Sequence, residues 1–382
     1  MISCRCVRWP KIESPRIPLR VEENAIMKAS PLVTVGAWAA VAVVAQALGA
    51  SPSWAQNGAP HYEVDASWPK PLPDRWVLGG LGGVCVDGQD HVVILNRQDI
   101  LEGELNAGRM APSIIEFGTP GNVVNSWSKP DLLDPRLHSC HFDKENNFWV
   151  AAAPSGVVQK FTHDGSRLLL QIGKKGVLDS SDGTIKGTPL NSPFAQFHMP
   201  SSIFVDRDNG DVYVADGESR NSNRRIAVMD REGRFLRQWK PEGVETVHCM
   251  TIGRDGLVYV CNRDNARIQV YDKLGNLKRI IELPWKPVTM PADGKIKQFG
   301  GATVAIDFSP DPEQTYMFVV NQNNSQIDIV DRKAGKLLSS FGSIGKQPGQ
   351  FDQAHGIAVD FNGNVYVAEN RGRRVHKFKI VQ

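Results

Sequence analysis

Residues 356–368 read GIAVDFNGNVYVA. Apolar residues alternate with small or polar ones on both sides of DFNG, a segment whose Asp, Asn and Gly are typical of a tight turn. The stretch therefore predicts two antiparallel strands joined by a hairpin. Five more stretches share this layout: residues 83–95, 139–152, 202–215, 249–261 and 303–320.

A second hairpin follows five of these six stretches, as in RIAVMDREGRFLRQW at residues 225–239. Each repeat thus holds four strands in roughly 50 residues, and the repeats show no sustained helical periodicity. Six such repeats predict an all-β protein, a six-bladed β-propeller. The last repeat ends after three strands, at residues 375–380. Because an unpaired strand edge promotes aggregation, we predict that the segment around Tyr62–Ser67 supplies the missing outer strand of the last blade.

The N-terminal region has the composition of a leader. Residues 29–55 carry no charged side chain and follow the basic Lys28. An apolar run over residues 31–50, with small residues after it, is typical of a secretory signal peptide cleaved near Ala55. An apolar run of about 20 residues is also long enough to cross a bilayer, so the leader would anchor the protein if it were not cleaved.

We therefore divide the chain into a leader at residues 1–55 and a propeller at residues 56–382. We expect export to the periplasm or the cell exterior, with no stable membrane insertion after cleavage. The net charge of +3 arises entirely within the leader, where six Lys or Arg residues accompany three Glu. A neutral propeller does not indicate a nucleic-acid partner. The overall composition, 41% hydrophobic and 22% charged, excludes collagen-like and wholly disordered chains.

The repeat places one residue of each blade at the same radius and height around the axis. This position lies five residues before the turn positions Asp87, Asp143, Asp206, Gly253, Asp307 and Asp360. Its occupants are Gly82, His138, Ser201, His248, Ala302 and His355.

Histidine thus occupies this position in alternate blades. A single histidine at a strand start is usually a turn or core residue, but three of them converge on the channel here. Three neutral imidazoles with an open fourth position form a catalytic zinc arrangement, so we predict that His138, His248 and His355 bind Zn²⁺. Zinc is preferred to copper or iron because no carboxylate or thiolate falls at the same position.

Two arginines follow the second strands of blades one and four, which lie opposite each other. The hairpins return Arg97 and Arg263 to the face that holds the histidines. A guanidinium recognises carboxylates through its planar fork of donors, although a surface salt bridge is the alternative. Long connections open on the same face, where loops usually carry binding functions: residues 97–112, 174–198, 217–224 and 284–299.

The ordered set Arg, His, His, Arg, His resembles that of the peptidyl-α-hydroxyglycine α-amidating lyases. It lies in LNR (95–97), LHSCHFD (137–143), VHCMTIG (247–253), NRDNARIQVY (262–271) and AHGIAVDFNGNVYVAEN (354–370). The resemblance spans residues 80–380 and implies a propeller of NHL-type repeats with a zinc ion on three histidines. It also implies cleavage of a carbinolamide C–N bond in a small-molecule or peptide substrate with a carboxylate, giving an amide and glyoxylate.

Several positions depart from the family pattern. Glu218 stands where the family has its catalytic tyrosine, and is a candidate replacement base, although an exposed loop acid is the simpler interpretation. His198 and Ser219 take the places of two disulfide-bonded cysteines, and His198 is a further candidate for approaching the site. Gly356 replaces a calcium-binding Asp, which makes calcium doubtful, and Gln353 replaces a methionine.

The cysteines allow one pairing within a blade. Cys249 and Cys261 fall opposite each other across the turn at Asp255 and can form a disulfide in an exported protein. Two buried thiols are favoured instead, because directly opposed strand residues give strained bridges. Cys85 and Cys140 have no evident partner.

Two functions remain open at this point. The first is a zinc-dependent lyase related to the amidating lyases, and the ordered site residues favour it. The second is a non-catalytic NHL-repeat propeller that binds a protein or peptide on its top face. A calcium-dependent lactonase ranks last, since that chemistry needs acidic and Asn ligands at the channel mouth.

Overall fold

The computed structural model describes residues 58–286 and 301–381, which belong to one compact unit. The predicted leader and most of the 284–299 connection lie outside these residues. Among the described residues the helices are short 3₁₀ turns: η2 (Pro73–Arg75), η3 (Glu102–Asn106), η4 (Ala153–Ser155) and η5 (Arg263–Asn265). In the same part of the chain, no helix combines the length and apolar character needed to cross a membrane.

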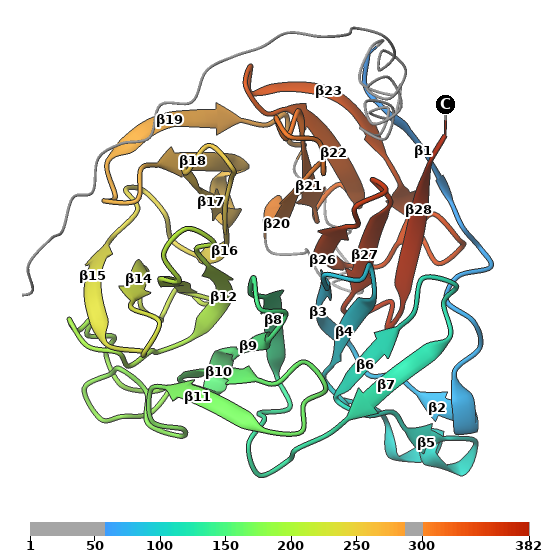
Figure 1. Cartoon of the computed structure of the whole chain (residues 1–382), viewed down its shortest axis with the longest axis horizontal. Helices are drawn as coiled ribbons and strands as arrows, with labels where there is room; N and C mark the ends of the chain where they lie inside the picture. Colours follow the sequence, from blue (N-terminus) through green and yellow to red (C-terminus); the bar gives the residue numbers. More distant parts are fainter. Residues whose placement is uncertain (1–57, 287–300, 382) are drawn as a thin grey trace, which may run out of the picture. The chain divides into compact units, whose positions relative to one another are not determined.

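Six four-stranded antiparallel sheets surround a common axis, which confirms the predicted six-bladed propeller (Figure 1). Blade one contains β3 (Leu81–Val86), β4 (Val92–Asn96), β6 (Ile114–Phe117) and β7 (Val123–Trp127). Blade two contains β8 (Leu137–Phe142), β9 (Phe148–Ala152), β10 (Val157–Phe161) and β11 (Leu168–Ile172). Blade three contains β12 (Pro200–Val205), β13 (Val212–Asp216), β14 (Arg225–Met229) and β15 (Phe235–Trp239).

The remaining three blades follow the same order from the axis outward. Blade four contains β16 (Val247–Ile252), β17 (Val258–Asn262), β18 (Arg267–Tyr271) and β19 (Leu277–Glu282). Blade five contains β20 (Thr303–Phe308), β21 (Tyr316–Asn321), β22 (Gln326–Asp331) and β23 (Lys336–Phe341). Blade six contains β26 (Ala354–Val359), β27 (Val365–Glu369), β28 (Val375–Val381) and β1 (His61–Val64). Two short parallel pairs complete the strands: β2 (Trp76–Val77) with β5 (Arg109–Met110), and β24 (Ser343–Ile344) with β25 (Gln350–Phe351).

Burial decreases from the axis to the rim. The second strand of each blade is almost fully buried, as in β13, whereas the outer strand β23 alternates between exposed and half-buried residues. Apolar side chains of adjacent blades pack into separate layers, such as the one that joins Ile268 of blade four to Ile306 and Met317 of blade five. The fold is therefore held together by interfaces between blades, which fix the inner strands around the axis.

The predicted N-terminal closing strand is confirmed, with slightly different bounds. Strand β1 pairs antiparallel with β28, with His61 opposite Val381 and Val64 opposite Phe378. The Tyr62 ring stacks on Phe341 with ring centroids 5.2 Å apart, and its hydroxyl donates to the Gly363 carbonyl at 3.0 Å. The chain's first described strand thus completes its last blade.

The residue predicted for the axial position of blade five was wrong by two positions. Asp307 still lies within β20, and the turn begins at Ser309, whose N–H donates to the Tyr316 carbonyl at 2.9 Å. Val304, the second residue of β20, therefore occupies the position assigned to Ala302. The turn of this hairpin is longer than the others, so counting five residues back from Asp307 gave a residue two positions too early.

Two disulfides correct the cysteine predictions. Cys249 and Cys261 are bridged within blade four, so the preference for free thiols was wrong. Cys85 and Cys140 are also bridged, with Cα atoms 5.8 Å apart, although the sequence offered them no partner. They lie on β3 and β8, the innermost strands of adjacent blades, and a search for partners within one hairpin cannot find such a pair.

The closing strand leads to a first prediction. Replacing Tyr62 with Ala removes its stacking and its hydroxyl hydrogen bond, and should reduce the free energy of unfolding by about 2 to 3 kcal/mol. Chemical denaturation measures this loss. The exposed neighbour Glu63, replaced with Ala, is the control and should change stability little. Equal stability of the two variants would contradict closure by β1.

Candidate metal centre

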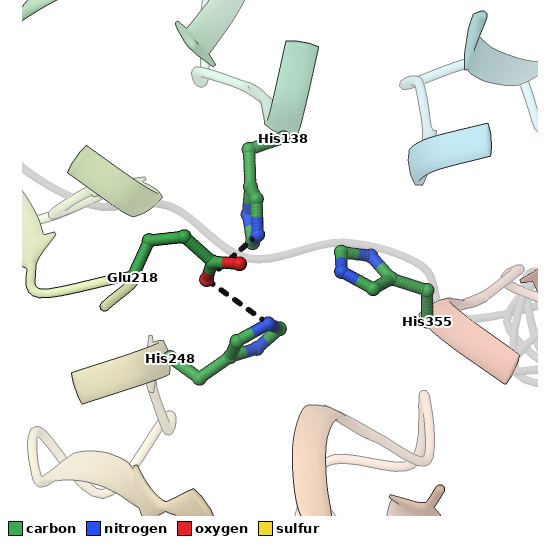
Figure 2. Close-up of side chains that lie close together, drawn as sticks. All are labelled: His138, Glu218, His248 and His355. Atoms are coloured by element: carbon green, nitrogen blue, oxygen red, sulfur yellow. Dashed lines mark ion pairs between the residues drawn. The ribbon is translucent and has the colours of Figure 1, made fainter. Parts of the chain in front are cut away.

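The three predicted histidines meet on the axis. His138, His248 and His355 are the second residues of β8, β16 and β26, and all three are buried. Their ring centroids lie 4.8 to 5.1 Å apart. Figure 2 shows the imidazoles pointing toward one another from three different blades.

Each imidazole is held by the backbone of the next blade around the ring. The Nδ1 atom of His138 lies 2.5 Å from the Ser201 carbonyl oxygen, and that of His248 lies 2.6 Å from the Val304 carbonyl oxygen. The Nδ1 atom of His355 lies 2.9 Å from the Gly82 carbonyl oxygen. Because a carbonyl only accepts, Nδ1 carries the proton, and the Nε2 lone pair of a neutral ring is directed to the axis.

Close packing explains why glycine occupies the equivalent position in blade one. A Cβ atom at Gly82 would lie 1.8 Å from the carbonyl oxygen of Leu137, so no side chain fits there. The alternation of histidine with other residues around the axis matches a pattern of hydrogen bonds between neighbouring blades. Blades two, four and six supply imidazoles, while blades three, five and one supply the carbonyls that orient them.

Glu218 joins the histidines, so its interpretation as an exposed loop acid was wrong. It follows β13 across Gly217, and the N–H groups of both residues donate to the Met199 carbonyl at 3.0 and 3.1 Å. Its Oε2 atom lies 3.0 Å from Nε2 of His138 and 3.1 Å from Nε2 of His248, and the side chain is 13% exposed (Figure 2). Comparison of the strand-start position in each repeat could not find this carboxylate, because Glu218 lies in a loop.

Burial and neighbouring charges shift the pKa values of three groups in this site. Burial lowers the pKa of His248 to about 3. Burial, together with the Arg97 guanidinium, holds the pKa of His355 well below its usual range. Burial alone would raise the pKa of Glu218, but His138, His248 and the nearby Arg263 outweigh it and hold that pKa well below its usual range.

The donor set fits a metal ion. Nε2 of His138, Nε2 of His248 and Oε2 of Glu218 are buried and have no hydrogen-bond partner. Two lone pairs and a carboxylate oxygen at these distances repel one another unless a cation or an added proton lies between them. Their separations are close to the edge of about 3.3 Å expected for a tetrahedral zinc site with bonds of about 2.0 Å. The three histidines and Glu218 could therefore hold a metal together.

Both predicted arginines flank this group. Arg97 is half-buried, its Nε atom donates to the Leu137 carbonyl at 3.1 Å, and burial lowers its pKa. Arg263 begins η5, and its Nη1 atom lies 3.8 Å from Oε1 of Glu218. His198 does not join the group: it is buried, its backbone N–H donates to Oδ1 of Asp216 at 3.0 Å, and burial lowers its pKa.

A cavity of about 370 Å³ extends along the axis from the histidines. The innermost strands of all six blades form its wall, and Gly356 on β26 belongs to this wall. A Cβ atom at Gly356 would lie 3.0 Å from the Gly83 Cα atom, so the backbone of β26 closely approaches β3 here. This position offers no side-chain ligand for calcium.

Comparisons with known proteins agree with the fold. A family model described as "Beta-propeller repeat" matches residues 344–368. NHL repeat-containing protein 3 of Homo sapiens is 27% identical over 338 residues, which cover 83% of this chain and 84% of that protein. Peptidyl-alpha-hydroxyglycine alpha-amidating lyase 1 of Drosophila melanogaster is 25% identical over 359 residues, which cover 83% of this chain and 59% of that protein.

A solved structure is similar in fold alone. The streptogramin B lyase structure has a TM-score of 0.51 and 15% sequence identity, and the match covers 84% of this chain and 98% of that chain. The repeats, the six blades and these relatives lead to one assignment. The chain belongs to the NHL-repeat propellers, and its homologues include amidating lyases and NHL repeat-containing protein 3.

Proposed function

We propose that the protein is a metal-dependent carbon–nitrogen lyase that cleaves a carbinolamide to an amide and glyoxylate. The observation that carries this proposal is the group of three inward-facing imidazoles with Glu218 among them and two guanidiniums beside them. The named activity of the Drosophila relative supports the same reaction class. We further propose that the protein acts after export, since its two disulfides suit an oxidising compartment.

In this proposal, His138, His248 and His355 hold the metal, and zinc is the preferred ion for such a histidine set. A bound zinc ion supplies Lewis acidity toward the oxygen atoms of the substrate. Arg263, beside Glu218, binds the substrate carboxylate through its fork of donors. Arg97 adds positive charge on the opposite side and fixes the adjacent Leu137 backbone.

Glu218 is the proposed base. Its low pKa keeps it ionised, so one carboxylate oxygen is free to accept the proton of the substrate hydroxyl. The hydroxyl oxygen then forms the carbonyl of glyoxylate as the C–N bond breaks, and the amide nitrogen receives the bonding electron pair. Return of the proton from Glu218 to that nitrogen completes the amide and restores the carboxylate.

A second candidate is a non-catalytic propeller that binds a peptide or protein on the face with the histidines. Two observations favour it: Glu218 replaces the tyrosine expected from the resemblance, and NHL repeat-containing protein 3 is matched over most of its length. In that case the metal would stabilise the ring and would not take part in a reaction.

Metal analysis tests the shared premise of both candidates. The triple variant His138→Ala/His248→Ala/His355→Ala should contain about one metal ion per chain less than the wild type, because it lacks the three histidine ligands. Plasma emission spectroscopy of the purified proteins measures the difference. Replacement of the exposed His61 with Ala is the control and should change nothing. Equal metal content in wild type and triple variant would refute the centre.

Glyoxylate release separates the lyase from the binding protein. The metal-loaded wild type should release glyoxylate from an N-acyl-α-hydroxyglycine, and Glu218→Gln should lower kcat by about 10² to 10⁴, the usual contribution of a general base. Glu245→Gln is the matched control, because Glu245 is half exposed and pairs only with Arg224 among the described residues. The absence of glyoxylate from metal-loaded wild type would favour the binding protein.

The role of Arg263 has its own test. Arg263→Ala should raise KM for the acid substrate by about 10- to 100-fold, the value of a charged hydrogen bond, and Arg263→Lys should recover part of the loss. Steady-state kinetics with the acid and with its C-terminal amide measure the effect. The amide cannot use the guanidinium fork in the same way, so its KM should change little. Equal losses for both substrates would assign Arg263 a structural role.

A further inference from the structure

A second group of metal-type ligands lies away from the histidine ring. Asp87 follows the end of β3, the strand whose start carries Gly82 beside the ring. Glu116 lies on β6 of the same blade, and His163 lies in the turn between β10 and β11 of blade two. Together with His91, they form what we call the blade-one cluster.

The cluster is compact and mostly buried. Nε2 of His163 lies 2.9 Å from Oδ2 of Asp87 and 3.7 Å from Oε1 of Glu116. Nδ1 of His91 lies 2.7 Å from the same Glu116 oxygen and 3.7 Å from the same Asp87 oxygen. The carboxylate side chains are 0% and 5% exposed, whereas the imidazoles are 28% and 30% exposed. The carboxylates are therefore shielded, while a path for an ion remains beside the rings.

The charge of the two carboxylates is not balanced by a fixed cation. In two other blades the equivalent turn aspartate pairs with a lysine: Asp143 with Lys160, and Asp206 with Lys273. In blade six, Asp360 instead accepts hydrogen bonds from Asn364 and Tyr366. No Lys or Arg of the described residues is within ion-pair distance of Asp87 or Glu116. Since burying two carboxylates without a permanent countercharge is costly, these groups need a positive charge beside them, from a bound cation or from a protonated imidazole.

We propose that Asp87, Glu116 and His163 bind a divalent zinc-like ion that joins blades one and two. Their ligand atoms all lie within 4.8 Å of one another. The separations of Nε2 of His163 from the two carboxylate oxygens, 2.9 and 3.7 Å, lie on either side of the edge of about 3.3 Å expected for tetrahedral zinc. The imidazole favours zinc over Mg²⁺ and Ca²⁺, which prefer oxygen ligands alone.

His91 is a positioning residue in this proposal. Its Nδ1–H donates to Glu116, while its backbone N–H donates to Oδ1 of Asp87 at 2.8 Å, so one residue orients both carboxylates. Such outer contacts typically change metal affinity by about 10- to 100-fold. The ion would reinforce the interface that the Cys85–Cys140 disulfide already crosses.

The experiment uses the full chain without the ring histidines. The variant His138→Ala/His248→Ala/His355→Ala is stripped with EDTA and titrated with Zn²⁺ by calorimetry and by thermal unfolding. We expect one remaining zinc site and a higher Tm with zinc. Adding His163→Ala should weaken that site at least 100-fold and abolish the shift in Tm, while His91→Ala should weaken it about 10-fold. Adding His61→Ala is the control and should have no effect.

The outcomes separate this site from the proposed lyase centre. Zinc binding that is unchanged by His163→Ala, or absent from the background variant when that variant is folded, would overturn the cluster proposal and leave the ring untouched. If the background variant does not fold, the wild type should bind two zinc ions and His163→Ala one. A third result would also overturn the proposal. In it, acidification in EDTA raises the Tm, His163→Ala removes this gain, and zinc produces no gain. Protons would then balance the charge of the carboxylates.

Discussion

The functional site depends on hydrogen bonds between the blades. Each ring imidazole is oriented by a carbonyl of the following blade, and the His355 bond to Gly82 crosses the interface between the last blade and the first. Strand β1 completes the same last blade from the N-terminal side. The position of one metal ligand is therefore linked to closure of the whole ring, because any slippage between blades six and one displaces the His355 ring.

Glu218 changes the chemistry that three histidines alone would offer. A set of neutral imidazoles leaves the double positive charge of a bound ion intact, whereas a carboxylate cancels half of it. Arg263, whose Nη1 atom lies 3.8 Å from Glu218, and the nearby Arg97 restore positive charge around the group. The site thus combines an anionic ligand or base with two cations, an arrangement suited to a substrate that carries its own carboxylate.

The sequence predicted features that repeat within a blade and missed those that arise between blades. The period of strands and turns was sufficient for the six blades, for β1 and for the convergence of the three histidines, because these follow from one repeated position. Val304 was missed since the blade-five turn is longer, and the Cys85–Cys140 bridge was missed since it joins two blades. Glu218 was a named candidate, but only the backbone path through Gly217 reveals that its side chain turns inward.

Comparison of the turn positions of different blades also shows where one blade differs from the others. The turn aspartates Asp143 and Asp206 are shielded by the fold, and burial of their charge is costly without a partner. Lys160 and Lys273 carry a permanent charge and meet that need for Asp143 and Asp206. His163 contacts Asp87 from the next blade in a comparable way, but an imidazole is charged only when protonated. With Glu116 adding a second carboxylate, this interface combines two buried carboxylates with no permanent cation among the described residues, and that combination distinguishes it from an ordinary ion pair.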